Sequence, residues 1–436
     1  MNIVHHRSQV LLPKALEWML CAIVFLLPFQ TRWVTTTGTL NGGPWEYGTV
    51  SLYGLDILII LFFCVWIGYV VMQKKHIRLS LSHVLALLLL LIALFSMAFA
   101  ANKINALFWW WKLAEGIVLM IVVSHCSFNK QRVIIAWIIS AVLQSIFALI
   151  QFFSQQVVGI RWLGISTQHP DTYGVQVIES AVGRTLRSYG SLPHPNILAG
   201  FLVIAIILCF VLCITHEQKN RRNMYALLVL LLLSSGLWTT FSRQAWIALA
   251  IVLCGILLHT FFVKRIFSPV AIIATLSVVI PMSVLSLLYP HLLESRIHMN
   301  TRLEQWSVTE REHYMHQSVD IVRNHWATGV GMGNYTAFIH SQDKQHNIIK
   351  PGTTYQPVHN IYLLIFSELG IFGLSALVLL LLSVGIHIQK QNPYSMAWGM
   401  SIIALLIIGF FDHYLWSLHI GLLLFWITLG FSESRS

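Results

Sequence analysis

Charged residues are scarce in this chain of 436 residues. They make up 10% of the sequence, whereas soluble domains carry roughly 25%. Apolar residues make up 57%, so the composition excludes an ordinary soluble domain and indicates a polytopic membrane protein. The net charge of +11 does not require a nucleic acid, because membrane proteins gather Lys and Arg at the cytoplasmic surface. We expect membrane lipids, and no nucleic acid, as partners.

The sequence also lacks a disulfide framework, an internal repeat and a strong metal motif. All six cysteines fall in or beside apolar segments, which favours buried thiols. His313 and His316 lie three residues apart beside Glu312, but no convincing third ligand accompanies them. We therefore expect neither a metal site nor a cofactor.

Long apolar segments are abundant. Twelve can be marked, and each approaches the roughly 20 residues that a membrane helix needs. The expected fold is therefore all-α and polytopic, with about 12 transmembrane helices in a single integral membrane domain over residues 1–436. The segments lie near residues 15–30, 51–72, 81–100, 106–125, 133–154, 195–215, 224–240, 244–262, 267–289, 360–388, 395–411 and 413–431.

Basic residues predict the orientation of these segments. The short odd-numbered loops hold only Arg32, Lys103 and Arg243, whereas every even-numbered segment is followed by basic residues. Because Lys and Arg favour the cytoplasmic side, both termini are expected there and the odd-numbered loops face outward. The residues after even-numbered segments are Lys74, Lys75, Arg78, Lys130, Arg132, Lys219, Arg221, Arg222, Lys264, Arg265, Lys390 and Arg435.

Two outward loops are long, one over residues 155–194 and one over residues 290–358. The second is balanced in charge and predicts a folded, partly helical cap. Trp306, Tyr314 and Ile321 suggest a helix with one apolar side, resting on the membrane surface. The glycine turn at 329–334 follows no predicted strand, so a plain turn is favoured over a nucleotide loop.

His359 and Asn360 stand where the second long loop meets an apolar segment. An ionisable imidazole at the level where water meets lipid costs free energy unless it is paired or solvated, so His359 is a functional candidate. The alternative is an interfacial histidine that helps to cap the helix. Glu368, about two and a half turns further on, is expected to support structure.

Two further groups precede outward helix starts. Arg187 and His194 lie before the sixth segment, where neighbouring prolines and a capping Asn196 explain much of the local pattern but not these two side chains. Arg243 begins the eighth segment beside free backbone N–H groups, which together form an anion site. The alternative for Arg243 is a side chain that reaches the lipid headgroups.

The remaining candidates lie in the large loop and near the last segment. Arg302 could merely pair with Glu304 at the surface, which contributes little. Asp412 and His413 could orient a partner, although a solvated turn is the favoured interpretation. Two arginines and one histidine on the same side suit one chemistry: guanidiniums hold a departing diphosphate, and His359 takes a proton from an attacking hydroxyl.

An ion pair is also predicted within the membrane. Lys112 and Glu115 lie three residues apart on the fourth segment, so they share one helix face. They leave open a function of another class, a polytopic transporter or lipid flippase in which this pair and His359 relay protons. Transporters often show paired halves, and the missing repeat disfavours that alternative.

Four motifs occur in order along the chain. They are Ser-Arg-x-x-Trp at 242–246, Arg-Leu-x-x-Trp at 302–306, Gly-x-Gly-x-Gly-Asn at 329–334, and His-Asn-x-Tyr-Leu with Glu-Leu-Gly-Ile-x-Gly at 359–373. This order resembles the O-antigen ligase family, which belongs to a superfamily with O-antigen polymerases and protein O-oligosaccharyltransferases.

The resemblance implies a metal-independent membrane glycosyltransferase of the C-like class in the bacterial inner membrane, with its active site facing the periplasm. Its donor would be a glycan on undecaprenyl diphosphate, and its acceptor a lipid A-core sugar or another hydroxyl. Arg243 and Arg302 correspond to the family's diphosphate-binding arginines, and His359 to its catalytic histidine. Arg187, His194, Asn360 and Asp412 are possible supporting residues. A polymerase and a protein O-oligosaccharyltransferase remain alternatives that differ in acceptor.

Overall fold

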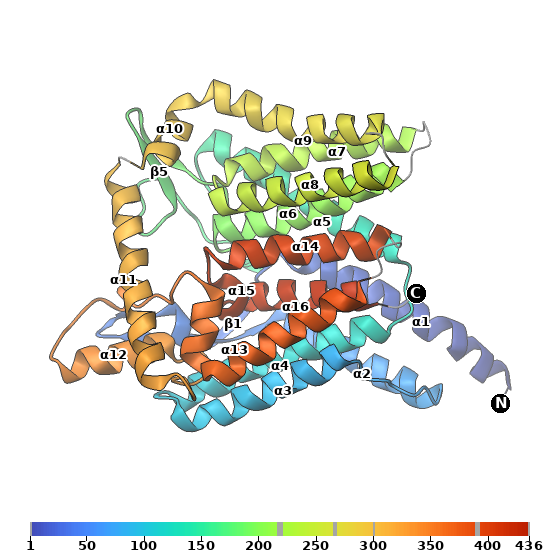
Figure 1. Cartoon of the computed structure of the whole chain (residues 1–436), viewed down its shortest axis with the longest axis horizontal. Helices are drawn as coiled ribbons and strands as arrows, with labels where there is room; N and C mark the ends of the chain where they lie inside the picture. Colours follow the sequence, from blue (N-terminus) through green and yellow to red (C-terminus); the bar gives the residue numbers. More distant parts are fainter. Residues whose placement is uncertain (1, 216–220, 265–267, 300, 389–392, 435–436) are drawn as a thin grey trace.

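The computed structural model describes residues 2–215, 221–264, 268–299, 301–388 and 393–434. Apolar helices run side by side along the longest axis, and polar elements gather at one end (Figure 1). In the described ranges, eight helices are long and apolar enough to cross a membrane, and three shorter helices are also apolar. The all-α polytopic class predicted from the sequence is therefore confirmed.

Each of the twelve predicted segments coincides with a helix, and the last one is divided in two. The helices are α1 (Asn2–Leu26), α2 (Gly54–Met72), α3 (Leu81–Ser96), α4 (Lys103–His125), α5 (Lys130–Ser154), α6 (Pro195–Thr215), α7 (Arg221–Thr239), α8 (Arg243–Lys264), α9 (Pro269–Leu288), α13 (Ile361–His387), α14 (Pro393–Gly409), α15 (Tyr414–Ser417) and α16 (His419–Glu433). The division falls at Leu418, whose backbone is extended.

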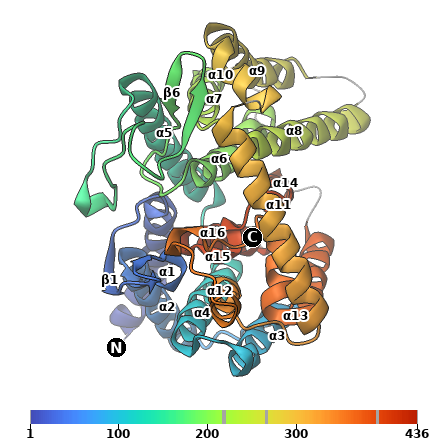
Figure 2. The same cartoon turned by 90° about the vertical axis from the view of Figure 1, so that its left-hand side faces the viewer.

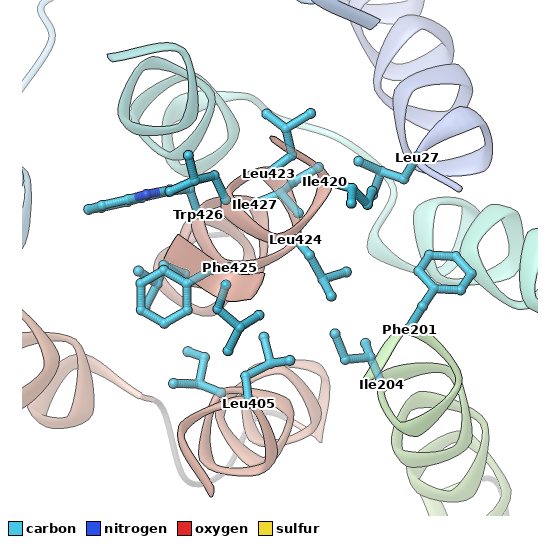
Figure 3. Close-up of a cluster of buried hydrophobic side chains, with 14 of the residues drawn as sticks. Leu27, Phe201, Ile204, Leu405, Ile420, Leu423, Leu424, Phe425, Trp426 and Ile427 are labelled. Carbon is cyan, nitrogen blue, oxygen red and sulfur yellow. The ribbon is translucent and has the colours of Figure 1, made fainter. Parts of the chain in front are cut away.

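The core is centred on α16. Phe201 and Ile204 of α6 and Leu405 of α14 surround Leu424 and Phe425 of α16 (Figure 3). Because α16 is enclosed, the residues at its start are held at a fixed place at the outer end of the bundle.

The polar elements at that end form a cap. It contains α10 (Pro290–His298), α11 (Arg302–His325) and α12 (Tyr335–Gln345). Among the described residues, the cap also contains three antiparallel strand pairs: β1 (Arg32–Thr36) with β4 (Val50–Tyr53), β2 (Thr39–Leu40) with β3 (Gly43–Pro44), and β5 (Val177–Ser180) with β6 (Gly183–Leu186). The described ranges also contain four short 3₁₀ turns: η1 (Glu46–Gly48), η2 (Met97–Phe99), η3 (Arg161–Leu163) and η4 (Gly352–Thr354).

The helix α11 crosses the end of the bundle (Figure 2). It confirms the helix predicted in the second long loop. Tyr314 and Ile321 are buried, whereas Trp306 is exposed, so the predicted apolar side is divided between the protein interior and the surface.

The helix α1 begins and α16 ends at the end of the bundle opposite the cap (Figure 1). This arrangement agrees with termini on one side and long loops on the other; which side is cytoplasmic stays a prediction. Of the basic residues behind that prediction, Lys219, Arg265, Lys390 and Arg435 lie outside the described residues.

The glycine turn is a structural joint. At Gly370 the helix α13 is kinked, with φ at +66°, and a side chain there would collide with the Ala327 carbonyl. The turn supplies hydrogen bonds across the kink, since Val330 N donates to Ser367 O at 2.9 Å. This contact fixes α13, and His359 lies just before the first residue of that helix.

Glu368 belongs to the same joint. Its carboxylate accepts hydrogen bonds from Trp416 Nε1 at 2.9 Å and from Tyr335 N at 3.3 Å. These contacts tie α13 to α15 and α12, as expected for a residue that supports structure.

Candidate functional site

Asn360, and not His359, caps α13. Its Oδ1 accepts from the backbone N–H groups of Tyr362 and Leu363, both at 3.0 Å. A cap of this kind satisfies donors that a helix start leaves unpaired. Since Asn360 fills that role, the His359 side chain is free for another.

The imidazole of His359 lies between two other rings. It stacks on Tyr314 with centroids 6.1 Å apart and meets His413 edge-on at 4.8 Å. Its Nδ1 is buried and has no hydrogen-bond partner among the described residues. Burial lowers the pKa of His359 to about 3, with His413 acting in the same direction and Asp412 opposing it. The ring is therefore neutral at neutral pH.

Asp412 is the hub of the surrounding polar groups. Its Oδ2 accepts from Asn196 Nδ2 at 2.7 Å and from Gln244 Nε2 at 2.8 Å, and its Oδ1 accepts from His413 N at 2.8 Å. Asp412 and His413 are only 5% and 6% exposed. The interpretation of these two residues as a solvated turn is therefore wrong, because α6, α8 and α15 enclose them.

The carboxyl group of Asp412 is held ionised. Burial alone would raise its pKa, but His413, His359 and His194 and the hydrogen bond from Asn196 together lower the pKa below its usual range. A carboxylate at this place stabilises positive charge on the imidazoles around it.

Arg187 and His194 reach the same hub through Asn196. Arg187 Nη2 donates to Asn196 Oδ1 at 2.6 Å, and His194 Nδ1 accepts from Asn196 N at 3.1 Å. The Asn196 side chain thus joins Arg187 to Asp412 and does not cap α6. Burial and the nearby Arg296 lower the pKa of Arg187, and burial lowers the pKa of His194 to about 3.

Arg243 lies in a group of paired charges beside this hub. Its Nη1 donates to the backbone oxygen of Arg296 at 2.6 Å, and its Nη2 lies 3.1 Å from Glu304 Oε2. Arg296 also contacts Glu304 and donates to Phe241 O at 2.8 Å. The start of α8, the end of α10 and the start of α11 are thereby locked together.

Arg302 lies outside these groups. Its side chain is 77% exposed and lies 3.5 Å from Glu179. Arg302 and Arg311 are nine residues apart on α11, about two and a half helical turns, and so point to opposite faces. Of the predicted arginines, the structure brings Arg187 and Arg243 to the cluster and leaves Arg302 at the surface.

Arg311 is the arginine of α11 that faces the cluster. Its Nε is buried without a hydrogen-bond partner among the described residues. Burial lowers the pKa of Arg311; Asp412 and Glu304 raise it, and Arg243 lowers it. Arg311 therefore lies close enough to Asp412 and to Arg243 to interact electrostatically with both side chains.

The cluster carries surplus positive charge. Four guanidiniums, from Arg187, Arg243, Arg296 and Arg311, accompany two carboxylates, from Glu304 and Asp412. An excess of two positive charges around neutral imidazoles suits a bound anion with two negative charges.

Sequence reasoning missed Arg311 and Gln244 and undervalued His413. A signal for Arg311 existed, because Glu304, Arg311 and Ser318 are seven residues apart and so share one face of α11. Glu304 and Ser318 on that face are buried. Nothing in the sequence marks Gln244, because its partner Asp412 lies 168 residues away.

A second charged group lies deeper, between α2, α4 and α16. The predicted pair of Lys112 and Glu115 is confirmed at 3.5 Å, and Lys112 also contacts Asp56. His419 Nε2 lies 2.9 Å from Asp56 Oδ1 and 3.5 Å from Glu115 Oε2. We call these four residues the ion cluster.

The ligand atoms of Asp56, Glu115 and His419 lie within 4.8 Å of one another, a spacing that a metal ion could use. However, the ammonium of Lys112 touches both carboxylates, so a cation already neutralises them.

On the cap, Glu312 and His316 form an exposed pair at 3.9 Å.

Comparison with known proteins identifies one region. Residues 228–378 match the family model described as O-antigen ligase. The match covers α8 to α12 and most of α13, and so includes Arg243, Arg302, Arg311 and His359. No curated protein sequence matches the chain.

Proposed function

We propose that this chain, whose residues 228–378 match the O-antigen ligase family model, is a ligase that transfers an O-antigen-type polysaccharide from undecaprenyl diphosphate to a sugar hydroxyl of a lipid A core. The observation that carries this proposal is the cluster at the outer end of the bundle. It combines a surplus of guanidinium charge with a neutral imidazole whose Nδ1 has no hydrogen-bond partner in the ranges that the structure describes.

The guanidiniums hold the donor diphosphate. Arg311 is the leading candidate because its Nε is buried and has no partner within the described part of the chain, and burying an unpaired polar atom costs free energy. Arg243 acts beside it at the start of α8. The predicted Arg302 lies on the other face of α11, so we assign the second diphosphate contact to Arg311.

His359 is the general base. Its neutral ring accepts the proton of the acceptor hydroxyl as that oxygen bonds to the anomeric carbon. The bond from this carbon to the diphosphate oxygen breaks, and the electron pair leaves with undecaprenyl diphosphate. The arginines stabilise the charge that develops on that leaving group, which makes the transfer independent of a metal ion.

The supporting residues set the charge around His359. Asp412 stabilises the imidazolium that forms when His359 takes the proton, as a carboxylate does for a catalytic histidine. Arg187, His194 and Asn196 fix Asp412 through the hydrogen bonds described above, whereas Asn360 fixes the start of α13.

The proposed location follows from the charge pattern of the loops. The chain lies in the bacterial inner membrane with both termini in the cytoplasm, and the cap with its active site faces the periplasm. Undecaprenyl-linked glycans and lipid A core would both reach the site from the outer leaflet of that membrane.

A transfer assay tests the proposal. Purified protein receives a labelled glycan on undecaprenyl diphosphate, a chelator, and one of three acceptors: lipid A core, a second lipid-linked glycan, or a protein. Label on the lipid A core is the expected result. Chain lengthening would instead identify a polymerase, and labelled protein would identify a protein O-oligosaccharyltransferase.

The ion cluster favours the transporter or flippase alternative as a second candidate, because buried ionisable residues within membrane helices often move protons. Proteoliposomes that contain the protein and labelled donor, without acceptor, separate the two. Donor that crosses the bilayer in response to a pH gradient would support the flippase, and donor that stays in its leaflet would support the ligase.

A further inference from the structure

A cavity of about 410 Å³ lies beside the cluster. Its wall includes Tyr47, Tyr53, Trp109, Ser166, His194 and His419, and we call it the His194 cavity. This volume falls within the usual range of small-ligand sites, roughly 300–1,000 Å³.

The cavity is one ring away from the imidazole pair. Tyr47, in its wall, packs edge-on against His413 with centroids 5.8 Å apart, and His413 in turn meets His359 at 4.8 Å. His194 also belongs to both places, since it lines the cavity and borders Asp412. Along this path the rings of Tyr47 and His413 lie between the cavity and His359, whereas His194 lines the cavity itself.

The lining suits a neutral molecule that carries hydroxyl groups. Arg32 and Glu46 lie in the wall but pair with each other at 2.6 Å, which leaves no surplus charge there. The aromatic rings offer apolar faces to a sugar ring. His194 adds a donor: its Nδ1 accepts from Asn196 N at 3.1 Å, so the neutral ring carries its proton on Nε2.

The deep wall is held rigidly by the ion cluster. His419 is 3% exposed, stacks on Tyr53 at 4.1 Å, and presents Nε2 to Asp56 and Glu115. Its Nδ1 has no hydrogen-bond partner among the described residues. Buried polar atoms are rarely left unpaired, so a ligand hydroxyl is a fitting partner for this nitrogen.

A second cavity, of about 370 Å³, borders Tyr314, the ring that stacks on His359. Glu310, His313 and Tyr314 of α11 line it, whereas Arg311, on the same helix, does not. The His194 cavity, in contrast, has no lining residue from α11. Direct displacement at a sugar carbon brings the incoming oxygen and the leaving group to opposite faces of that carbon.

We propose that the His194 cavity binds the acceptor as an uncharged, hydroxyl-bearing sugar unit, while the donor diphosphate lies on the α11 side of His359. The proposal rests on the transferase function proposed above. It assigns the acceptor site to β4, the 157–168 loop, the approach to α6 and the start of α16.

The test fills the mouth of the cavity. Ser166 is exposed and lines it, and Thr172 is exposed in the same loop but does not line it. Ser166→Trp should raise the KM for lipid A-core acceptor by about tenfold or more, equivalent to about 1.4 kcal/mol, and should leave the donor KM within twofold. The matched Thr172→Trp should leave both KM values unchanged.

Calorimetric titration with acceptor core oligosaccharide, without donor, gives a readout that needs no turnover. Wild type and Thr172→Trp should bind equally, and Ser166→Trp should bind about tenfold more weakly. Equal binding by all three proteins, or a rise in donor KM instead of acceptor KM, would overturn the acceptor site. A failed transfer assay with intact, Ser166-dependent sugar binding would overturn the ligase function alone.

Discussion

Two charged regions of the chain are built from similar residues but differ in balance. The cluster around His359 has more guanidiniums than carboxylates, and Arg311 Nε finds no hydrogen-bond partner among the residues that the structure describes. In the ion cluster, two carboxylates contact the ammonium of Lys112 and the ring of His419. A surplus of buried charge is unfavourable without a ligand, whereas a paired cluster can persist without one. The first region is therefore suited to binding an anion, and the second to holding helices in register.

The largest effect should follow from removal of the imidazole in the arginine-rich region. His359→Ala is expected to lower kcat by about 10²–10⁴-fold, the usual loss when a general base is removed. Donor affinity should change little, because the arginines remain. Steady-state kinetics of glycan transfer measure both quantities, and His346→Ala, at an exposed site on the cap, serves as the control. A variant that retains wild-type turnover would exclude His359 from proton transfer.

A substitution in the ion cluster should lower the free energy of unfolding. Lys112→Met leaves Asp56 and Glu115 without their ammonium and should cost about 3–5 kcal/mol, as when one partner of a buried ion pair is lost. Thermal unfolding of the purified protein measures this change. Arg132→Met breaks the more exposed pair with Glu17 and should cost less than about 1 kcal/mol. Equal losses of stability for the two substitutions would show that the ion cluster stabilises the packing of α2, α4 and α16 no more than an exposed ion pair does.

These two regions also show how far the sequence could predict the structure. Long apolar runs located most of the membrane helices within a few residues; for example, the segment expected at 195–215 is α6, Pro195–Thr215. The first segment was expected to begin near residue 15, whereas α1 begins at Asn2. The break at Leu418 was missed because an apolar extended residue leaves no mark on hydropathy. His359 could be proposed because its position at the start of an apolar helix is visible in sequence.

Contacts between distant helices could not be predicted in the same way. The ion cluster joins α2, α4 and α16, so only the local pair of Lys112 and Glu115 was foreseen. The choice between Arg302 and Arg311 depends on the rotation of α11, and the overall charge of the loop does not contain that information. Asp412 was interpreted as solvated because its partners, Asn196 and Gln244, are far away in sequence.

Substitutions of Arg302 and Arg311 test which face of α11 binds the donor diphosphate. Arg311→Ala should lower kcat/KM for the donor by about 30-fold or more, which corresponds to about 2 kcal/mol for a lost contact with a buried charge. Arg302→Ala should change it by less than about threefold, because its exposed pair with Glu179 contributes little. Donor titrations at saturating acceptor make the measurement. A larger loss for Arg302→Ala would return the diphosphate contact to the outer face of α11.

The smallest expected effect is on the stability of the folded chain at acidic pH. In the folded chain the pKa of His359 is about 3, against an ordinary value of 6.5, so below pH 6.5 the unfolded chain binds a proton that the folded chain does not. This difference lowers the free energy of unfolding as pH falls from 6.5 toward 3. Between pH 6.5 and 5.5 the loss from this one group is about 1 kcal/mol. His359→Gln should therefore show a shallower decline in Tm than the wild type across that interval, whereas exposed His346→Gln should follow the wild type. Parallel declines in all three proteins would mean that His359 keeps its ordinary pKa in the folded chain, and would contradict the lowered pKa described above.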